Sequence, residues 1–391
     1  MGSPEDSGLH FASEEEIRQG KVADVYFLRT REILNALGIR KKVKVELTAK
    51  SFPRDWQWGL FAGLGEVVSL LSGMDVDLWA MDEGSVFYRE EPFLVIEGDY
   101  IEFGIFETSI LGLVCQASGI ATVSARYRMA AGNKTIISFG ARRMHPVIAP
   151  MIERYAYVGG CDGVAVVKSA EALDIEPVGT MPHALVLTIG DLDGALKAFD
   201  KVVDPSIPRI ALIDTFGDEK FEAIKACEIL GKSLYAVRLD TPSSRRGNFA
   251  RIIEEVRWEL DLRGFENVKI LVSGGINEAT VRELNDIVDG YGIGTSISNA
   301  PVIDCAMDIV EVDGVPLAKR GKKSGAKAVY RCEDHLHSLI LPDRNIPPAL
   351  CSCGSPLKPA LSKILTGGKL EAELPRPKSI REHVLHQLTK L

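Results

Sequence analysis

Short glycine-rich clusters follow two apolar runs in the second half of this 391-residue chain. Ser273-Gly274-Gly275 follows the apolar run 268–272, and Gly294-Thr295 follows the run 291–293. Glycine allows successive main-chain N–H groups to close around an anion, because it adopts backbone conformations that other residues avoid. Two such turns at the ends of consecutive predicted strands therefore indicate a phosphate-binding site.

Charged side chains occupy the ends of other apolar runs. Arg142 and Arg143 come shortly after Phe139, and a guanidinium group can hold a carboxylate or phosphate through two parallel hydrogen bonds. His183 follows a Gly-Thr turn, where an imidazole can act as a base or a nucleophile near neutral pH. A single histidine or an arginine pair is often structural, but the neighbouring clusters favour a functional role here.

Two aspartates end further runs of the same series. Asp214 precedes Thr215, and Asp240 follows Arg238 and one leucine. Their carboxylates suit ribose hydroxyl groups or a Mg²⁺ ion bound to pyrophosphate. An aspartate at such a position can equally cap the following helix, and for Asp214 both interpretations stand.

The elements that must position these residues alternate between strands and helices. The predicted strands are 134–139, 163–167, 176–180, 209–215, 233–240, 268–275 and 289–295, and the predicted helices between them include 191–203, 218–231, 249–264 and 277–288. This alternation predicts parallel strands with right-handed crossovers, and six or seven units indicate a barrel. In such a barrel the carboxyl ends of the strands converge on the site. We therefore predict an irregular β/α barrel over residues 113–316.

The regions before and after the predicted barrel show other patterns. Residues 1–112 predict an α+β sandwich lobe, with a helix over 13–40 that Ser13 and Glu16 open as a capping box. Strand-like runs at 42–49 and within 73–100 follow in that lobe. Residues 317–391 form a third segment, with a basic loop, a cysteine cluster and a terminal helix over 379–391.

The cysteine cluster has the spacing of a metal site. Cys332 and His335 form a Cys-x2-His pair, and Cys351 and Cys353 form a Cys-x-Cys pair. Three thiolates and one imidazole suit a closed, tetrahedral and structural Zn²⁺ site, with His337 as a rival ligand and free thiols as the alternative. The four remaining cysteines stand singly in apolar stretches, as buried reduced thiols do: Cys115, Cys161, Cys227 and Cys305.

Composition narrows the class of protein. The net charge of −8 argues against a nucleic-acid-binding surface. No uninterrupted apolar run approaches the roughly 20 residues of a membrane helix. The acidic N-terminal residues 1–17 do not resemble a secretory signal, so we expect a cytoplasmic protein without a membrane partner.

Taken in order, the motifs resemble those of one enzyme family. The motifs are DVYFLRT (24–30), FGARR (139–143), GTMPH (179–183), LIDT (212–215), VRLD (237–240), SGGI (273–276) and GIGT (292–295). This ordered set resembles the nicotinate phosphoribosyltransferases, type II phosphoribosyltransferases of the archaeal type, and it covers roughly residues 14–331. The resemblance implies joining of nicotinate to 5-phosphoribosyl-1-pyrophosphate, with nicotinate mononucleotide and pyrophosphate as products. It also implies Mg²⁺, ATP as a co-substrate, and a homodimer or higher homo-oligomer with shared sites.

The resemblance implies roles for individual residues. His183 matches the family histidine that ATP phosphorylates, Arg142 and Arg143 meet the pyrophosphate and the nicotinate carboxylate, and Tyr26 stacks on the pyridine ring. The candidate substrate-binding residues are Tyr26, Phe139, Arg142, Arg143, Asp214, Thr215, Arg238, Asp240, Ser273, Gly274, Gly275, Gly294 and Thr295. The candidate catalytic residues are His183, Arg142 and Asp240.

Other functions remain open at this point. Quinolinate phosphoribosyltransferase shares the architecture but must neutralise two substrate carboxylates, for which Arg245 and Arg246 are further cations. A phosphosugar isomerase or lyase on a barrel would also use glycine turns. An interaction module would rest on the cysteine cluster alone.

Overall fold

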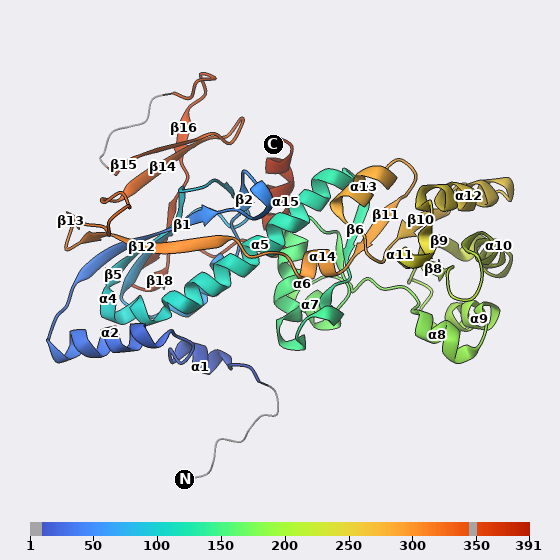
Figure 1. Ribbon diagram of the computed structural model, residues 1–391, viewed down its shortest axis with the longest axis horizontal. Helices are drawn as coiled ribbons and strands as arrows, with labels where there is room; N and C mark the ends of the chain where they lie inside the picture. The colour runs from blue at the N-terminus through green and yellow to red at the C-terminus, as the bar shows by residue number, and fades with distance from the viewer. Residues whose placement is uncertain (1–9, 344–349) are drawn as a thin grey trace, which may run out of the picture. The chain divides into compact units, whose positions relative to one another are not determined.

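The computed structural model describes residues 10–343 and 350–391 (Figure 1). The acidic N-terminal stretch, residues 1–17, therefore lies partly outside the described residues. Contacts divide the chain into two compact units. Residues 1–122 and 301–391 form the first unit, and residues 123–300 form the second. The segment 317–391, which the sequence separates from the rest, thus packs with the N-terminal lobe.

The first unit is built on a seven-stranded antiparallel sheet with the order β13-β12-β1-β5-β3-β17-β18. Its strands are β1 (Lys42–Ser51), β3 (Val76–Ala80), β5 (Pro92–Asp99), β12 (Asp304–Val312), β13 (Val315–Pro316), β17 (Ser362–Thr366) and β18 (Lys369–Leu370). The short strands β2 (Gly59–Leu60) and β4 (Val86–Phe87) pair separately. Alternate residues of β1 face the core, where Val45 and Leu47 are fully buried. The predicted α+β sandwich lobe is confirmed.

Helices and a small sheet complete this unit. The helices are α1 (Glu14–Arg18), α2 (Val25–Ala36), α3 (Leu64–Leu71), α4 (Tyr100–Phe103), α5 (Glu107–Ala131), whose last residues extend into the second unit, and α15 (Pro377–Leu388). The small sheet has the order β15-β14-β16, formed by Ser338–Pro342, Lys327–Cys332 and Leu357–Pro359. It is tied to the first unit by two buried glutamates, because Glu46 pairs with Lys327 and Glu91 pairs with Arg331, each at 2.7 Å.

The N-terminal helix differs from the prediction in one respect. The capping box is present, since Ser13 Oγ accepts the Glu16 N–H at 3.2 Å and the Glu16 carboxylate accepts the Ser13 N–H at 3.0 Å. The predicted single helix over 13–40 is wrong, because it is two helices separated at Gly20. Gly20 has φ +71°, and a side chain there would lie 2.5 Å from Ile105 Cδ1, so the chain turns away at this point.

One helical stretch, Tyr100–Ala131, is long and apolar enough to cross a membrane by length and composition. Of its most apolar 18-residue stretch, 67% is buried inside the protein. The core helix of a folded domain has the same properties, so this stretch is weak evidence for a membrane span.

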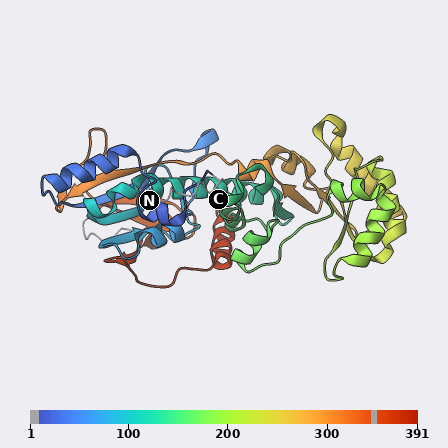
Figure 2. The same cartoon turned by 90° about the horizontal axis from the view of Figure 1, so that it is seen from below.

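The second unit is built on a six-stranded parallel sheet with the order β7-β6-β11-β10-β9-β8. Its strands are β6 (Thr135–Ser138), β7 (Gly163–Val164), β8 (Arg209–Leu212), β9 (Leu234–Leu239), β10 (Lys269–Val272) and β11 (Gly290–Ile293). Its helices are α6 (Ala149–Val158), α7 (Val167–Leu173), α8 (His183–Ile189), α9 (Leu192–Val202), α10 (Glu219–Leu230), α11 (Ser243–Arg246), α12 (Phe249–Leu262), α13 (Glu278–Leu284) and α14 (Thr295–Ser298). Helices α9 and α12 pack against α10, which contacts β8 and β9 (Figure 2).

The predicted irregular β/α barrel is confirmed as a parallel half-barrel. Strands β7 and β8 end the sheet and do not pair with each other. The predicted strand over 176–180 is wrong, since that stretch is irregular and only Val178 donates to the Val164 carbonyl, at 2.8 Å. Pro177 removes one ladder donor from this short stretch, which explains why it does not close the barrel.

Two glycines of helix α5 provide a matched test of packing in the first unit. Gly112 is exposed, and a side chain there would meet no atom within 4 Å, whereas at Gly119 it would lie 2.3 Å from the Pro301 carbonyl. Gly112→Ala should therefore raise the free energy of unfolding by about 0.5–1 kcal/mol. Gly119→Ala should lower it by roughly 1–3 kcal/mol. Denaturant unfolding measures both, and equal effects of the two substitutions would contradict this packing.

Candidate active site and metal centre

The predicted site residues of the second unit lie at one edge of the parallel sheet. Because all six strands run in the same direction, the segments that follow them share the carboxyl edge. Phe139 and Arg142 follow β6, Asp214 follows β8, Asp240 follows β9, and the two glycine turns follow β10 and β11. The structure therefore brings the strand-end residues together.

His183 lies between two carboxylates at this edge. It is the first residue of α8, and its Nε2 atom is 3.2 Å from Asp214 Oδ1, without the alignment of a hydrogen bond. Its Nδ1 atom is 3.9 Å from Asp240 Oδ2. The Asp240 N–H donates to Asp214 Oδ2 at 3.1 Å, so the two aspartates are joined to each other. An imidazole held between two carboxylates is well placed to accept and stabilise positive charge.

The pKa of Asp214 is perturbed. Burial raises the pKa of Asp214 to about 6; the charge of His183 opposes the rise and the charge of Asp240 adds to it. The carboxylate therefore gains or loses its charge just below neutral pH. Perturbed pKa values of this kind are concentrated at functional sites, although structural charge networks also produce them.

The first glycine turn is held in place by Asp240. The Ser273 hydroxyl donates to Asp240 Oδ1 at 2.7 Å. Gly274 has φ +77°, and a side chain on it would lie 2.8 Å from Asp240 Oδ1, so only glycine fits. Within the described part of the chain, the N–H groups of Gly274, Gly275 and Ile276 donate to no acceptor. These donors are available to an anion.

The second glycine turn lies on the neighbouring strand. The N–H groups of Thr295 and Ser296 also lack an acceptor among the described residues. Gly292, inside β11, allows a close contact, because a side chain there would lie 2.3 Å from the Phe139 ring. That ring thus packs directly on the strand backbone beside the turn. Two sets of free backbone donors and an aromatic ring share this part of the edge.

Three arginines contribute to the same edge. Arg238 lies 6.0 Å from the centre of the Phe139 ring and donates to the Met181 carbonyl at 3.3 Å, while its buried Nε atom has no partner. Burial lowers the pKa of Arg238, and the charge of Arg142 adds a smaller decrease, so these two cations are near each other. Arg142 and Arg143 are exposed on a short 3-10 turn over Ala141–Arg143.

Arg246 has a structural role that sequence reasoning missed. The sequence suggests only a further cation for a dicarboxylate substrate, yet the Arg246 Nε donates to the Thr241 carbonyl at 2.7 Å. Its Nη2 atom donates to the carbonyls of Ser273, at 2.9 Å, and Gly274. Because the carbonyls of this turn are bound on the Arg246 side, the turn is fixed with its N–H groups unpaired.

Tyr26 lies in the first unit, so its predicted stacking on a substrate ring stays a prediction. The side chain is 55% exposed, and its hydroxyl donates to Asp24 Oδ2 at 3.2 Å. The same carboxylate oxygen accepts the Thr108 hydroxyl at 2.9 Å. Tyr26 is therefore oriented by a hydrogen-bonded partner while its ring remains accessible.

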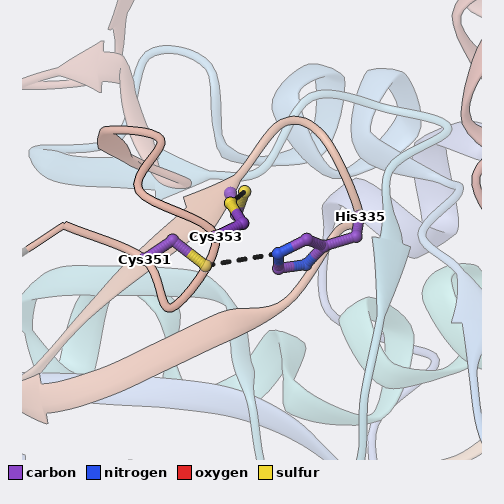
Figure 3. Close-up of side chains that lie close together, drawn as sticks. His335, Cys351 and Cys353 are labelled. Atoms are coloured by element: carbon purple, nitrogen blue, oxygen red, sulfur yellow. Dashed lines mark hydrogen bonds between the residues drawn. The ribbon is translucent and has the colours of Figure 1, made fainter.

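The cysteine cluster of the first unit has the geometry of a metal site. The ligand atoms of Cys332, His335, Cys351 and Cys353 all lie within 4.8 Å of one another. Figure 3 shows His335 pointing toward Cys351, with Nε2 and Sγ 3.3 Å apart; the Sγ atoms of Cys332 and Cys353 are 3.7 Å apart. A tetrahedral zinc site with bonds of about 2.0–2.3 Å requires donor atoms roughly 3.3–3.8 Å apart. The four residues fit that ion, and His337 is not part of the cluster.

Comparison with known proteins decides the family. The family models described as the quinolinate phosphoribosyl transferase N-terminal and C-terminal domains match residues 24–118 and 120–308. A crystal structure of nicotinate-nucleotide pyrophosphorylase from Pyrococcus furiosus is 52% identical, covers 98% of both chains and has a TM-score of 0.95. The chain belongs to the quinolinate phosphoribosyl transferase family.

Other members of this phosphoribosyltransferase family are more distant. A nicotinate phosphoribosyltransferase from Mycobacterium tuberculosis is 30% identical over 263 residues, which are 65% of this chain and only 55% of that protein. The human nicotinic acid phosphoribosyltransferase structure is 20% identical, covers 95% of this chain and 94% of its own, and has a TM-score of 0.77. At that identity the likeness shows a shared fold.

Arg246 and its neighbour Arg245 offer a matched test of the glycine turn. Arg245 is exposed, whereas Arg246 binds three backbone carbonyls. Arg246→Ala should weaken the binding of ribose 5-phosphate by roughly tenfold, since the turn loses its fixed conformation. Arg245→Ala should change it by less than about twofold. Titration calorimetry gives both dissociation constants, and equal losses would show that Arg246 acts only through its charge.

Proposed function

We propose that this protein transfers the phosphoribosyl group of 5-phosphoribosyl-1-pyrophosphate to nicotinate, giving nicotinate mononucleotide and pyrophosphate for NAD biosynthesis. The observation that carries the proposal is the composition of the sheet edge. The free backbone donors of two glycine turns share this edge with Arg238, a partly buried arginine that lies against an aromatic ring and has an unpaired Nε atom. His183, between two aspartates, lies at the same edge. The free N–H groups suit a phosphate, the arginine suits the carboxylate of a pyridine substrate, and the aspartates suit the positive charge that develops in the reaction.

The glycine turns suit the 5′-phosphate of the ribose. The unpaired N–H groups of Gly274, Gly275 and Thr295 are neutral donors that an anion accepts without displacing any internal hydrogen bond. Asp240 lies next to this turn through Ser273. Its outer oxygen is therefore placed to accept a ribose hydroxyl, and with Asp214 it is the candidate holder of the Mg²⁺ that accompanies pyrophosphate.

The nicotinate ring suits the surface formed by Phe139 and Arg238. The Phe139 ring packs on the Gly292 backbone. The Arg238 guanidinium, whose Nε is buried and unpaired, lies against the Phe139 ring. A substrate carboxylate would satisfy that donor in a charge-assisted hydrogen bond. Arg142 and Arg143, exposed at the rim, remain for the pyrophosphate.

The chemistry requires charge stabilisation rather than proton abstraction. The pyridine nitrogen is already a nucleophile, and the anomeric carbon becomes cationic as the bond to pyrophosphate breaks. Carboxylates on the ribose side and arginines on the pyrophosphate side stabilise these opposite charges, and fixed groups do so without reorganisation. Magnesium, when bound, neutralises the leaving group further.

In this proposal His183 is the residue through which ATP increases the yield of the transfer. An imidazole can accept the terminal phosphoryl group of ATP on one ring nitrogen and return it to water, while an aspartate on the other nitrogen stabilises the resulting charge. Asp214 and Asp240 each face one ring nitrogen, which supports this role.

Quinolinate is the alternative substrate. The family models carry its name, and the second carboxylate of quinolinate needs another cation. Of the two expected candidates, Arg245 and Arg246, the second uses its donors on three carbonyls of the protein, which favours the monocarboxylate nicotinate. The curated relatives named nicotinate phosphoribosyltransferase support the same choice. A phosphosugar isomerase or lyase has no support from the comparisons.

We further propose that the cysteine cluster holds a structural zinc ion and that the protein is a cytoplasmic homodimer or larger homo-oligomer. Four protein ligands fill a tetrahedral site and leave no position for a substrate. The cluster lies within the small sheet anchored by Glu46 and Glu91, since Cys332 ends β14 and Cys353 precedes β16, so we expect its effect to be on folding. We expect Tyr26 of a neighbouring subunit to complete each site.

Substrate choice is tested directly by offering 5-phosphoribosyl-1-pyrophosphate and Mg²⁺ with nicotinate, quinolinate or nicotinamide, each with and without ATP. Chromatography should show nicotinate mononucleotide from nicotinate, with ATP increasing its yield. His183→Ala should retain the transfer and lose the increase. Release of carbon dioxide from quinolinate at a comparable rate would contradict the choice, and an ATP effect that survives His183→Ala would remove its assigned role.

The zinc proposal predicts a stability effect with little change in chemistry. Elemental analysis should find one zinc per chain, and removing it should lower the melting temperature by several degrees. Cys351→Ser should do the same and abolish zinc content. Cys227→Ser provides the control, because that buried thiol lies in α10 outside the cluster. Full zinc retention in Cys351→Ser would refute the ligand set.

A further inference from the structure

Two glutamates of helix α10 hold the loops that follow Asp214 and Asp240. The Glu222 carboxylate accepts three successive backbone N–H groups, from Thr215 at 3.1 Å, Phe216 at 3.0 Å and Gly217 at 2.7 Å. Glu219, three residues earlier on the helix, accepts the Thr241 hydroxyl at 2.6 Å. Thr215 directly follows Asp214 and Thr241 directly follows Asp240, so one helical turn fixes both positions.

Burial makes the Glu222 contacts strong structural constraints. The residue is 5% exposed, and no lysine or arginine of the described chain pairs with it. A buried carboxylate is costly unless hydrogen bonds replace its water, and here the three amides supply them. Those amides in turn have no other acceptor among the described residues. The loop and the carboxylate therefore depend on each other.

The constraint reaches His183 through Asp214. One Asp214 oxygen accepts the Asp240 N–H, and the other lies beside His183 Nε2. A shift of the loop after Asp214 would withdraw both contacts together. A shift of Thr241 would move Asp240, which also orients Ser273 in the glycine turn.

We propose that Glu222 and Glu219 are positioning residues, which hold Asp214 and Asp240 at the separation that lets both carboxylates flank the His183 imidazole. Neither glutamate touches substrate in this account. The role of His183 in the reaction rests on the proposed function. The placement of Asp214 and Asp240 by the two glutamates does not depend on it.

The chain contains a matched control for the same device. Glu153 of α6 is fully buried, and its carboxylate accepts the N–H groups of Ala165 at 3.2 Å and Val166 at 3.0 Å. It thus holds the loop after β7, which carries none of the candidate site residues. Glu153→Gln and Glu222→Gln remove a comparable buried acceptor, but only the second does so beside an aspartate of the site.

The test compares Glu222→Gln, Glu153→Gln and wild type as purified full-length proteins. A glutamine that still accepts from Phe216 and Gly217 turns its NH₂ group against the Thr215 N–H, next to Asp214. The melting temperatures of both variants should fall by similar amounts. Only Glu222→Gln should lower kcat, by roughly ten- to a hundredfold, with KM for 5-phosphoribosyl-1-pyrophosphate within about twofold of wild type.

A second readout does not depend on activity. The rate at which diethyl pyrocarbonate modifies His183, followed by mass spectrometry, should change at least about threefold in Glu222→Gln and stay constant in Glu153→Gln. Glu219→Ala, at a half-buried position that tolerates truncation, should change it in the same direction and serves if Glu222→Gln fails to fold. Absence of phosphoribosyl transfer in wild type would refute the proposed function, and the modification rates would still decide this inference.

Equal loss of kcat in Glu222→Gln and Glu153→Gln would overturn the inference, since it would mark a general effect of stability. Unchanged His183 modification in both Glu222→Gln and Glu219→Ala would also overturn it. A change in His183 modification that is absent from the Glu153 variant, without an equal loss of kcat in the two variants, supports it.

Discussion

The site depends on backbone groups at the ends of the parallel strands. Charged side chains form the hydrogen bonds of several of these groups. A strand that ends at the sheet edge leaves N–H and C=O groups without a neighbour, and these groups must be satisfied or left for a ligand. Here Glu222 and Glu153 accept the amides of two loops, and Arg246 takes the carbonyls of the Ser273-Gly274 turn. Among the described residues, the two glycine turns keep N–H groups without an acceptor. Selective pairing thus leaves these donors available to a ligand.

The same logic explains the burial of so many charges in one unit. Each buried carboxylate or guanidinium would be costly by itself, and each is stabilised by backbone partners of opposite polarity. Two charged groups of the edge are less well paired, because the Nε atom of Arg238 and one oxygen of Asp214 are buried with no hydrogen bond, and burial raises the pKa of Asp214 to about 6. That Asp214 oxygen is located beside His183. The least satisfied acid of the edge is therefore the one that faces the candidate reactive group.

Much of the second unit follows from local sequence patterns. Apolar runs alternating with amphipathic stretches predicted all six strands, because parallel strands buried on both faces are short and continuously apolar. The cysteine spacing predicted a cluster that the structure assembles, since a metal site leaves a signal in four residues alone. The false strand over 176–180 shows the limit of such patterns, because whether a short apolar run pairs depends on a neighbour that local sequence does not reveal.

The residues that sequence reasoning missed act through tertiary contacts. Glu222 and Glu219 look like ordinary acidic residues in the first turn of a helix, and only the position of α10 beside two loops gives them their role. The packing of 317–391 on the N-terminal lobe was missed for the same reason, because Glu46 and Lys327 pair across 281 positions of sequence. The roles of the strand-end residues in substrate binding stay predictions.

A crystal structure of the protein with 5-phosphoribosyl-1-pyrophosphate and Mg²⁺ tests the central claim most directly. The account predicts that the 5′-phosphate lies within hydrogen-bonding distance of the free amides of both glycine turns, with the pyrophosphate toward Arg142. A 5′-phosphate held elsewhere, with these amides still unpaired or bound to water, would contradict it.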